Sequence, residues 1–99
     1  MSLEKPIGPE AILEKKKKYI MPCLAHFYKE PRQFVKGEMQ YLFDSEGRKY
    51  LDCFAGVSVI NCGHCNPEIN AEVVKQVQSL QHVCNTYLTE NFVNLAEKL

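Results

Sequence analysis

Apolar residues recur at helical spacing in three stretches of the chain, which cover residues 9–20, 67–80 and 90–99. The first stretch opens on Pro9 and Glu10, and proline suits a first helical turn because it has no amide hydrogen to leave unpaired. The other two follow Asn66 and Thr89, whose short polar side chains are favoured at helix N-caps. The pattern therefore predicts three amphipathic helices over these ranges.

Between the first two stretches, short apolar runs alternate with turn sequences. The clearest turn is Asp44-Ser45-Glu46-Gly47, where the aspartate can cap backbone N–H groups and the glycine accepts a positive φ angle. Residues 33–53 are therefore predicted to form a meander of short antiparallel strands. Helices flanking such a meander define an α+β fold class.

Residues 54–65 differ from both kinds of element. They contain no Asp, Glu, Lys or Arg, include two glycines and follow no regular period. A stretch of this kind is typical of backbone that packs against another surface or wraps around a ligand. We therefore expect residues 54–65 to line a pocket.

The overall composition is that of an ordinary globular protein, with 45% hydrophobic and 24% charged residues in a chain of 99. Its 12 basic and 12 acidic residues give no net charge, whereas nucleic-acid binding favours a basic excess. No strictly apolar run is longer than three residues, which is far short of a membrane-spanning helix. We therefore expect neither a nucleic acid nor a membrane as the partner.

The chain has five cysteines, an odd number that does not suit a pure disulfide framework. Reduced and mostly buried thiols are typical of a reducing compartment. We expect a cytoplasmic location, and the interior of an organelle is the other compartment that fits.

One motif, Cys62-Gly63-His64-Cys65, has the spelling of the C-x-x-C active site of disulfide isomerases. Only 34 residues follow it, too few for the sheet of a thioredoxin-like domain, and the chain has no tryptophan. A zinc site is the second alternative, with candidate ligands Cys62, His64, Cys65 and either His82 or Cys84. These residues do not form the two regularly spaced ligand pairs that are usual in a structural zinc site. A small thiol–disulfide or metal-binding module is therefore the alternative function.

Three further motifs follow one another along the chain: Tyr41-Leu42-Phe43-Asp44-x-x-Gly47-Arg48-x-Tyr50-Leu51-Asp52, Ala55-Gly56-Val57 and Gly63-His64-Cys65-x-Pro67. Their order resembles the N-terminal region of class III pyridoxal-phosphate-dependent aminotransferases of fold type I. The preceding Phe27-Tyr28-Lys29-Glu30-Pro31 is most similar to the alanine–glyoxylate and ω-amino-acid branch of that family. Each motif is short, so the resemblance rests on the ordered set.

The resemblance implies a transaminase, which moves an amino group between an amino acid or ω-amine and a 2-oxo acid of the pyruvate or glyoxylate type. It also implies pyridoxal 5′-phosphate as the cofactor, held on a lysine, and a homodimer as the assembly. In the family, that lysine and the phosphate site lie in a large domain that would follow residue 99. Residues 1–99 are thus expected to be an N-terminal segment without this domain, and to be inactive and without productive cofactor binding when alone.

Lys75 and Lys98 are the only lysines after residue 49, and both fall on polar helix faces. No catalytic, cofactor-binding or metal-binding residue is therefore assigned. The resemblance instead implies four residues of the substrate pocket, namely Gly56, Val57, Ser58 and Tyr87. Val57 matches a position where some relatives place an aromatic side chain against the substrate, so an aliphatic residue there favours small or ω-amino substrates. Core packing is the alternative role for Val57 and for Tyr87.

Overall fold

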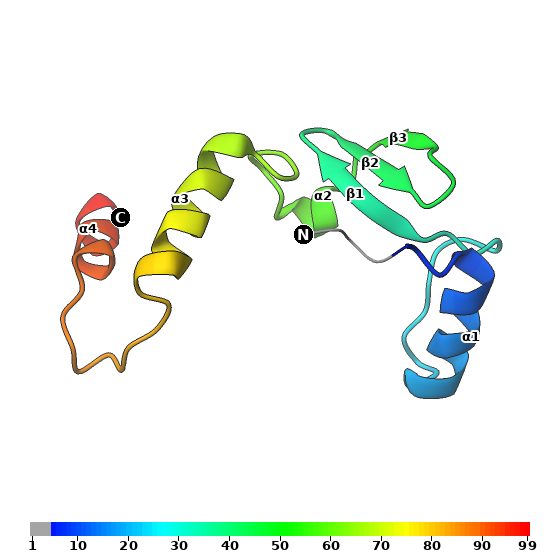
Figure 1. Cartoon of the computed structure of the whole chain (residues 1–99), viewed down its shortest axis with the longest axis horizontal. Helices are drawn as coiled ribbons and strands as arrows, with labels where there is room; N and C mark the ends of the chain where they lie inside the picture. Colours follow the sequence, from blue (N-terminus) through cyan, green and yellow to red (C-terminus); the bar gives the residue numbers. More distant parts are fainter. Residues whose placement is uncertain (1–4) are drawn as a thin grey trace. The chain divides into compact units, whose positions relative to one another are not determined.

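The computed structural model describes residues 5–99, so residues 1–4 of the predicted segment 1–99 lie outside the described residues. The chain divides into two compact units, the first ending at Asn66 and the second beginning at Pro67. Among the described residues, the first unit holds α1 (Pro9–Tyr19), β1 (Phe34–Glu38), β2 (Tyr41–Asp44), β3 (Lys49–Leu51) and α2 (Ala55–Ser58). The second unit holds α3 (Pro67–Ser79) and α4 (Glu90–Lys98), as Figure 1 shows.

The three long helices lie where the apolar periodicity places them, and each ends one residue earlier than the predicted range. Helix α1 ends at Tyr19 because Ile20 turns to an extended conformation (φ −103°, ψ 139°), while its N–H still bonds to the carbonyl of Lys16. Thr89 occupies the N-cap of α4, but its side chain makes no capping hydrogen bond. None of the described helices is both long enough and apolar enough to cross a membrane.

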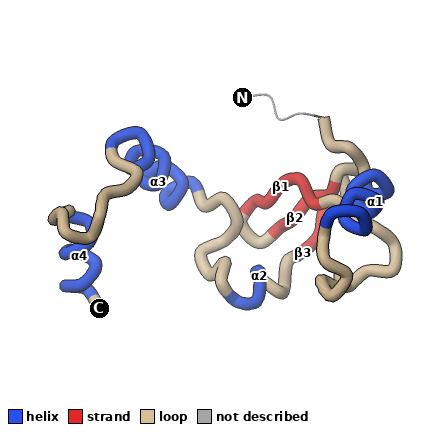
Figure 2. The backbone as a smooth tube through the Cα atoms, turned by 90° about the horizontal axis from the view of Figure 1, so that it is seen from below, coloured by secondary structure: helices blue, strands red, loops and turns tan. Residues whose placement is uncertain are grey.

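The strands form one antiparallel sheet in the order β1-β2-β3, which confirms the predicted α+β class with a short antiparallel meander and flanking helices. Figure 2 shows the three strands side by side. Lys36, Phe43 and Lys49 face one another across the sheet, and the pairing of β1 is irregular between Phe34 and Lys36. The Lys36 ammonium lies 4.9 Å from the centre of the Phe43 ring, so a cation from the edge strand covers an aromatic residue of the central strand.

Asp44 organises the turn between β2 and β3. It is the one buried residue among those that the structure describes, with 4% of its surface exposed. Its Oδ1 accepts hydrogen bonds from the N–H groups of Glu46 (3.0 Å) and Arg48 (2.9 Å), and its Oδ2 accepts one from the Tyr50 hydroxyl (2.7 Å). Gly47 has φ 82°, as a turn glycine often does. The turn that the sequence predicts is therefore built around a satisfied carboxylate.

The tip of the β1–β2 hairpin is tied to a later loop through Met39 and His64. The N–H of each residue donates to the carbonyl of the other, at 2.8 and 2.7 Å. This close approach requires glycine at position 37, because a Cβ atom there would lie 2.7 Å from the Cβ of His64. Gly63 is in the left-handed region (φ 89°), and a Cβ atom there would lie 3.0 Å from the Cα of Met39. Two glycines therefore allow two backbone segments to meet.

Apolar side chains do not form a core within the described residues. No described hydrophobic side chain is buried, and the stripe predicted on the last helix is exposed, including Phe92, Leu95 and Leu99. Burial of such side chains is the main source of folding free energy. The described residues therefore hold their shape through backbone and polar hydrogen bonds and present their apolar surface outward.

The isolated 99-residue chain is expected to unfold without a cooperative thermal transition and to bind a hydrophobic dye, because residues 5–99 contain no buried apolar cluster to melt. Circular dichroism at increasing temperature, with dye fluorescence at room temperature, checks both expectations. A sharp transition in a chain that binds no dye would contradict them.

Gly37→Ala is expected to destabilise the folded state by about 1–3 kcal/mol, because the added methyl group overpacks against the side chain of His64. The unfolding midpoint should be measured in the longer protein to which the sequence is expected to belong. Val35→Ala, in the same strand and 40% exposed, is the matched control and should change stability by less than about 1 kcal/mol. Equal effects of the two substitutions would disprove the close approach.

Asp44 is expected to make stability fall in acid. Burial raises the pKa of its carboxyl group, but hydrogen bonds from the Tyr50 hydroxyl and from the N–H groups of Arg48 and Glu46 outweigh burial, so the pKa lies below its ordinary value of 3.8. The contribution of the ionised group is thus complete above about pH 5 and is lost as the pH falls through the folded-state pKa. Between about pH 5 and pH 3, the unfolding midpoint of the longer protein should fall more than that of its Asp44→Asn variant. Parallel pH profiles would contradict this.

Candidate functional site

Asp52 lies two residues before residues 54–65, which the sequence predicts to line a pocket. It follows β3, and its own N–H donates to the carbonyl of Gln40 at 2.8 Å. Its Oδ1 accepts hydrogen bonds from the N–H groups of Phe54 and Ala55, both at 2.9 Å. An aspartate that bonds to the backbone two and three residues ahead forces the chain to turn at once. The direction of the following residues is therefore set by the Asp52 side chain.

The residues that follow form α2, which is a left-handed turn. Ala55, Gly56, Val57 and Ser58 have φ angles of 48°, 59°, 67° and 63°. Hydrogen bonds close it from the N–H of Ser58 to the carbonyl of Phe54 (3.0 Å) and from the N–H of Val59 to that of Ala55 (2.9 Å). This conformation costs roughly 1–2 kcal/mol for each residue that is not glycine. Sequence reasoning predicted no helix here.

Val57 is the most strained residue of the left-handed turn, because a β-branched side chain is a genuine outlier at positive φ. It is also 69% exposed, so packing within the first unit does not offset the strain. Strained and exposed backbone of this kind is concentrated at functional sites. The turn therefore marks residues 55–58 as a candidate site on structural grounds alone.

His64 closes the same segment at its other end. Its Nε2 lies 2.6 Å from Oδ2 of Asp52, the oxygen that the turn does not use. The side chains are 19% and 8% exposed, respectively. The hydrogen bond from His64, followed by those from the N–H groups of Ala55 and Phe54, holds the pKa of Asp52 below its ordinary value. The ionised form of Asp52 is therefore favoured, with Oδ1 bound to two amides at the start of the turn and Oδ2 bound to His64.

The predicted pocket residues fall in different units. Gly56, Val57 and Ser58 lie together in the left-handed turn, all exposed. A cavity of about 330 Å³ opens beside the turn and is lined by Met39, Gln40, Asp52, Ala55, Ile60, Asn61, Cys62, Gly63 and His64. Of the turn, only Ala55 is among these lining residues. Tyr87 belongs to the second unit, where it lines a cavity of about 210 Å³ with residues that include His82 and Phe92.

Sequence reasoning missed the pair of Asp52 and His64. It noted His64 as a member of short motifs and as a candidate zinc ligand, and Asp52 only as the end of a strand motif. The signal that could have found Asp52 is its position two residues before a charge-free stretch, where an aspartate can start a turn. The segment between Asp52 and His64 carries no local signal that the two side chains meet.

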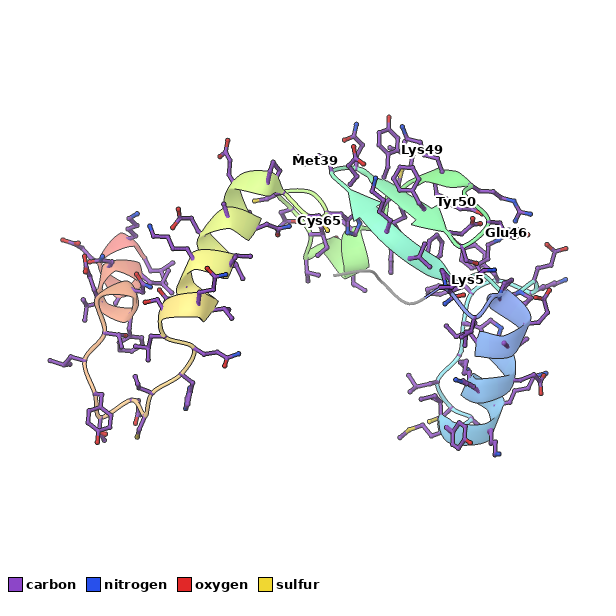
Figure 3. All side chains as sticks on the ribbon, viewed as in Figure 1. Lys5, Met39, Glu46, Lys49, Tyr50 and Cys65 are labelled. Atoms are coloured by element: carbon purple, nitrogen blue, oxygen red, sulfur yellow. The ribbon has the colours of Figure 1, made fainter. Side chains whose placement is uncertain are left out.

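The cysteine motif does not form a metal site among the described residues. Cys62 and Cys65 are free and exposed, and the imidazole between them bonds to Asp52. Asn66 donates from Nδ2 to the carbonyl of Cys62 at 2.9 Å and so closes the loop. Figure 3 shows Cys65 in this loop, which leads into α3, and Met39 at the tip of the hairpin. In residues 5–99 no three His, Cys, Asp or Glu side chains gather as a metal ion requires.

The lysines that follow the turn lack the setting of a nucleophile. A lysine that forms a Schiff base is activated by desolvation or by a neighbouring cation. Lys75 is instead exposed and pairs with Glu72 at 3.6 Å, and Lys98 is exposed near the end of α4. Neither of these two lysines is therefore assigned a catalytic role. The candidate site within the described residues consists of the left-handed turn and the wall of the cavity beside it.

Comparison with known proteins agrees with the resemblance found in the sequence. The family described as aminotransferase class-III matches residues 25–99. The chain is 45% identical over 94 residues to the mitochondrial alanine–glyoxylate aminotransferase 2 homolog 2 of Arabidopsis thaliana, covering 93% of this chain and 20% of that protein. It is 34% identical over 93 residues to the mitochondrial alanine–glyoxylate aminotransferase 2 of Homo sapiens, covering 94% of this chain and 18% of that protein.

A solved structure of ornithine aminotransferase from Toxoplasma gondii, described as having PLP at partial occupancy in its active site, superposes with a TM-score of 0.74 at 26% identity. The match covers 82% of this chain and 18% of that one. The chain thus spans about a fifth of the length of the curated relatives that it matches. With three quarters of its residues inside the family match and the expected fold in place, the chain belongs to the class-III aminotransferase family.

Proposed function

We propose that this chain acts as the N-terminal segment of a pyridoxal-phosphate-dependent transaminase. The enzyme would move an amino group from an amino acid or ω-amine to a 2-oxo acid of the pyruvate or glyoxylate type. Family membership and the two relatives named as alanine–glyoxylate aminotransferases support this reaction. The observation that carries the proposal is the strained and exposed left-handed turn, which holds three of the four residues that the resemblance assigns to the substrate pocket.

Pyridoxal 5′-phosphate is the cofactor of the proposed enzyme, and when bound it supplies an electron sink and carries the amino group. The described residues do not fit its binding by themselves, because none of the described lysines is buried, and Lys75 is paired with Glu72 as well. The described residues of this chain are therefore assigned no catalytic step. The cofactor and its lysine would belong to residues beyond this segment.

The proposed role of this chain is to shape the substrate pocket and to orient the substrate in it. Gly56 adopts the left-handed backbone conformation without strain, and Val57 presents two methyl groups at the surface of the turn. An apolar wall of this kind accepts the methylene chain of a small amino acid or an ω-amine and offers no partner to a second charged group. The assignment of Tyr87 to the substrate pocket stays a prediction from the resemblance.

The assembly is proposed to be a homodimer. The exposed apolar side chains of α3 and α4 need a covering, which would come from the rest of the enzyme and from its second copy. Neither a nucleic acid nor a membrane is proposed as a partner. The cytoplasmic location stays a prediction from the free cysteines, and the two curated relatives are named as mitochondrial.

The full-length protein, loaded with pyridoxal 5′-phosphate, is expected to convert alanine and glyoxylate into pyruvate and glycine. A coupled assay for pyruvate measures this. Val57→Phe is expected to raise the KM for the longer donor 4-aminobutyrate about tenfold relative to that for alanine, because the larger ring narrows the pocket.

Val59→Phe is the matched control for this experiment. Val59 is as exposed as Val57 (68% against 69%), but it lies just past the turn with ordinary right-handed angles. Its substitution should change the KM ratio of the two donors by less than about twofold. A full-length protein without activity on any amino donor would refute the proposed function, and equal effects of the two substitutions would remove Val57 from the pocket.

A further inference from the structure

The left-handed turn cannot be held by its own residues alone. Val57, Ala55 and Ser58 each favour other backbone angles, and the side chain of Val57 makes no packing contact that buries it. A strained conformation persists only where the surrounding structure determines it. Some group outside residues 55–58 must therefore keep the turn in place.

Val59 and Ile60 donate their N–H groups to the carbonyl of Ala55 on one side, and Asp52 reaches the turn from the other end. Its Oδ1 receives the N–H groups of Phe54 and Ala55 at 2.9 Å each, which are the first amides of the turn. Bonds between charged acceptors and backbone N–H groups are stronger than those between neutral groups. The orientation of the carboxylate thus decides the direction in which the turn starts.

His64 in turn orients Asp52. Its Nε2 holds the other carboxylate oxygen at 2.6 Å, so rotation of the carboxylate would break one bond or the other. The backbone of His64 is itself paired in both directions with Met39 at the tip of the hairpin. A chain of contacts therefore runs from the sheet through His64 and Asp52 to the left-handed turn.

We propose that the Asp52–His64 pair is a positioning device for substrate specificity: it holds the left-handed turn so that Val57 stands at a fixed place in the wall of the substrate pocket. The inference rests on the proposed transaminase function and deepens it. Neither residue touches the reacting atoms in this role. Their effect reaches the substrate only through the position of residues 56–58.

The test uses the full-length holoenzyme and four variants: His64→Ala, His64→Gln, Val57→Ala and the double variant His64→Ala/Val57→Ala. His64→Ala removes the donor to Asp52, whereas the amide of His64→Gln can donate from nearly the same place. His26→Ala is the matched control, an exposed histidine of the same unit. KM and kcat are measured with alanine and with 4-aminobutyrate, together with cofactor loading by absorbance.

His64→Ala is expected to raise the KM for 4-aminobutyrate about tenfold while kcat and cofactor loading stay within about threefold, because the wall is displaced and the chemistry is not. His64→Gln should restore KM to within about threefold of the parent. Val57→Ala should change the KM ratio of the two donors about fivefold in the parent and less than about twofold in the His64→Ala background. His26→Ala should leave all values unchanged.

Hydrogen exchange at single amides gives a readout that needs no activity. The amides of Phe54 and Ala55 should exchange faster in His64→Ala and at the parental rate in His64→Gln. The proposal would be overturned if His64→Ala changed kcat as much as KM. It would also be overturned if His64→Gln did not restore KM, or if Val57→Ala changed the KM ratio as much in the His64→Ala background as in the parent. If the unsubstituted full-length enzyme were inactive, the proposed function and the specificity role would both be refuted. Faster amide exchange in His64→Ala would then show that the Asp52–His64 pair only stabilises the fold.

Discussion

The carboxylate of Asp52 is the contact on which the shape of the first unit depends. One of its oxygens directs the chain into the left-handed turn, and the other fixes the loop that returns to the hairpin. Asp44 has the same role in the turn between β2 and β3, where its buried carboxylate gathers two amides and a hydroxyl. The first unit has no buried apolar side chain among its described residues. Two carboxylates whose oxygens all accept hydrogen bonds fix its turns instead of a hydrophobic core.

Much of this fold could be predicted from the sequence because its signals are local. The turn at Asp44 needs only an aspartate, a glycine and their spacing, and the helix after Pro67 needs only periodic apolar residues and proline at its start. Both signals are present within a few residues of the element that they specify. The same holds for the order of motifs, which was enough to indicate the family without any geometry.

The left-handed turn could not be predicted in this way, because its local signals point elsewhere. Valine at position 57 favours extended structure, and a single glycine does not require four successive left-handed residues. What determines the turn is a carboxylate before it and a histidine twelve residues beyond that carboxylate. The sequence pattern indicated only that residues 54–65 line a pocket, and the individual assignments of Gly56, Val57, Ser58 and Tyr87 came from the resemblance.

The arrangement of lysines on the small sheet has a consequence for how the protein is made. Among the described residues, each outer strand of the sheet pairs with β2 alone, and a ribosome releases these strands before later parts of the chain can fold. β1 carries Lys36 and an irregular pairing near Phe34, and β3 carries Lys49. Charges and a bulge on exposed edges discourage strands of neighbouring nascent chains from joining the sheet. The positions of Lys36 and Lys49 are thus expected to lower the tendency of newly made chains to aggregate through this sheet.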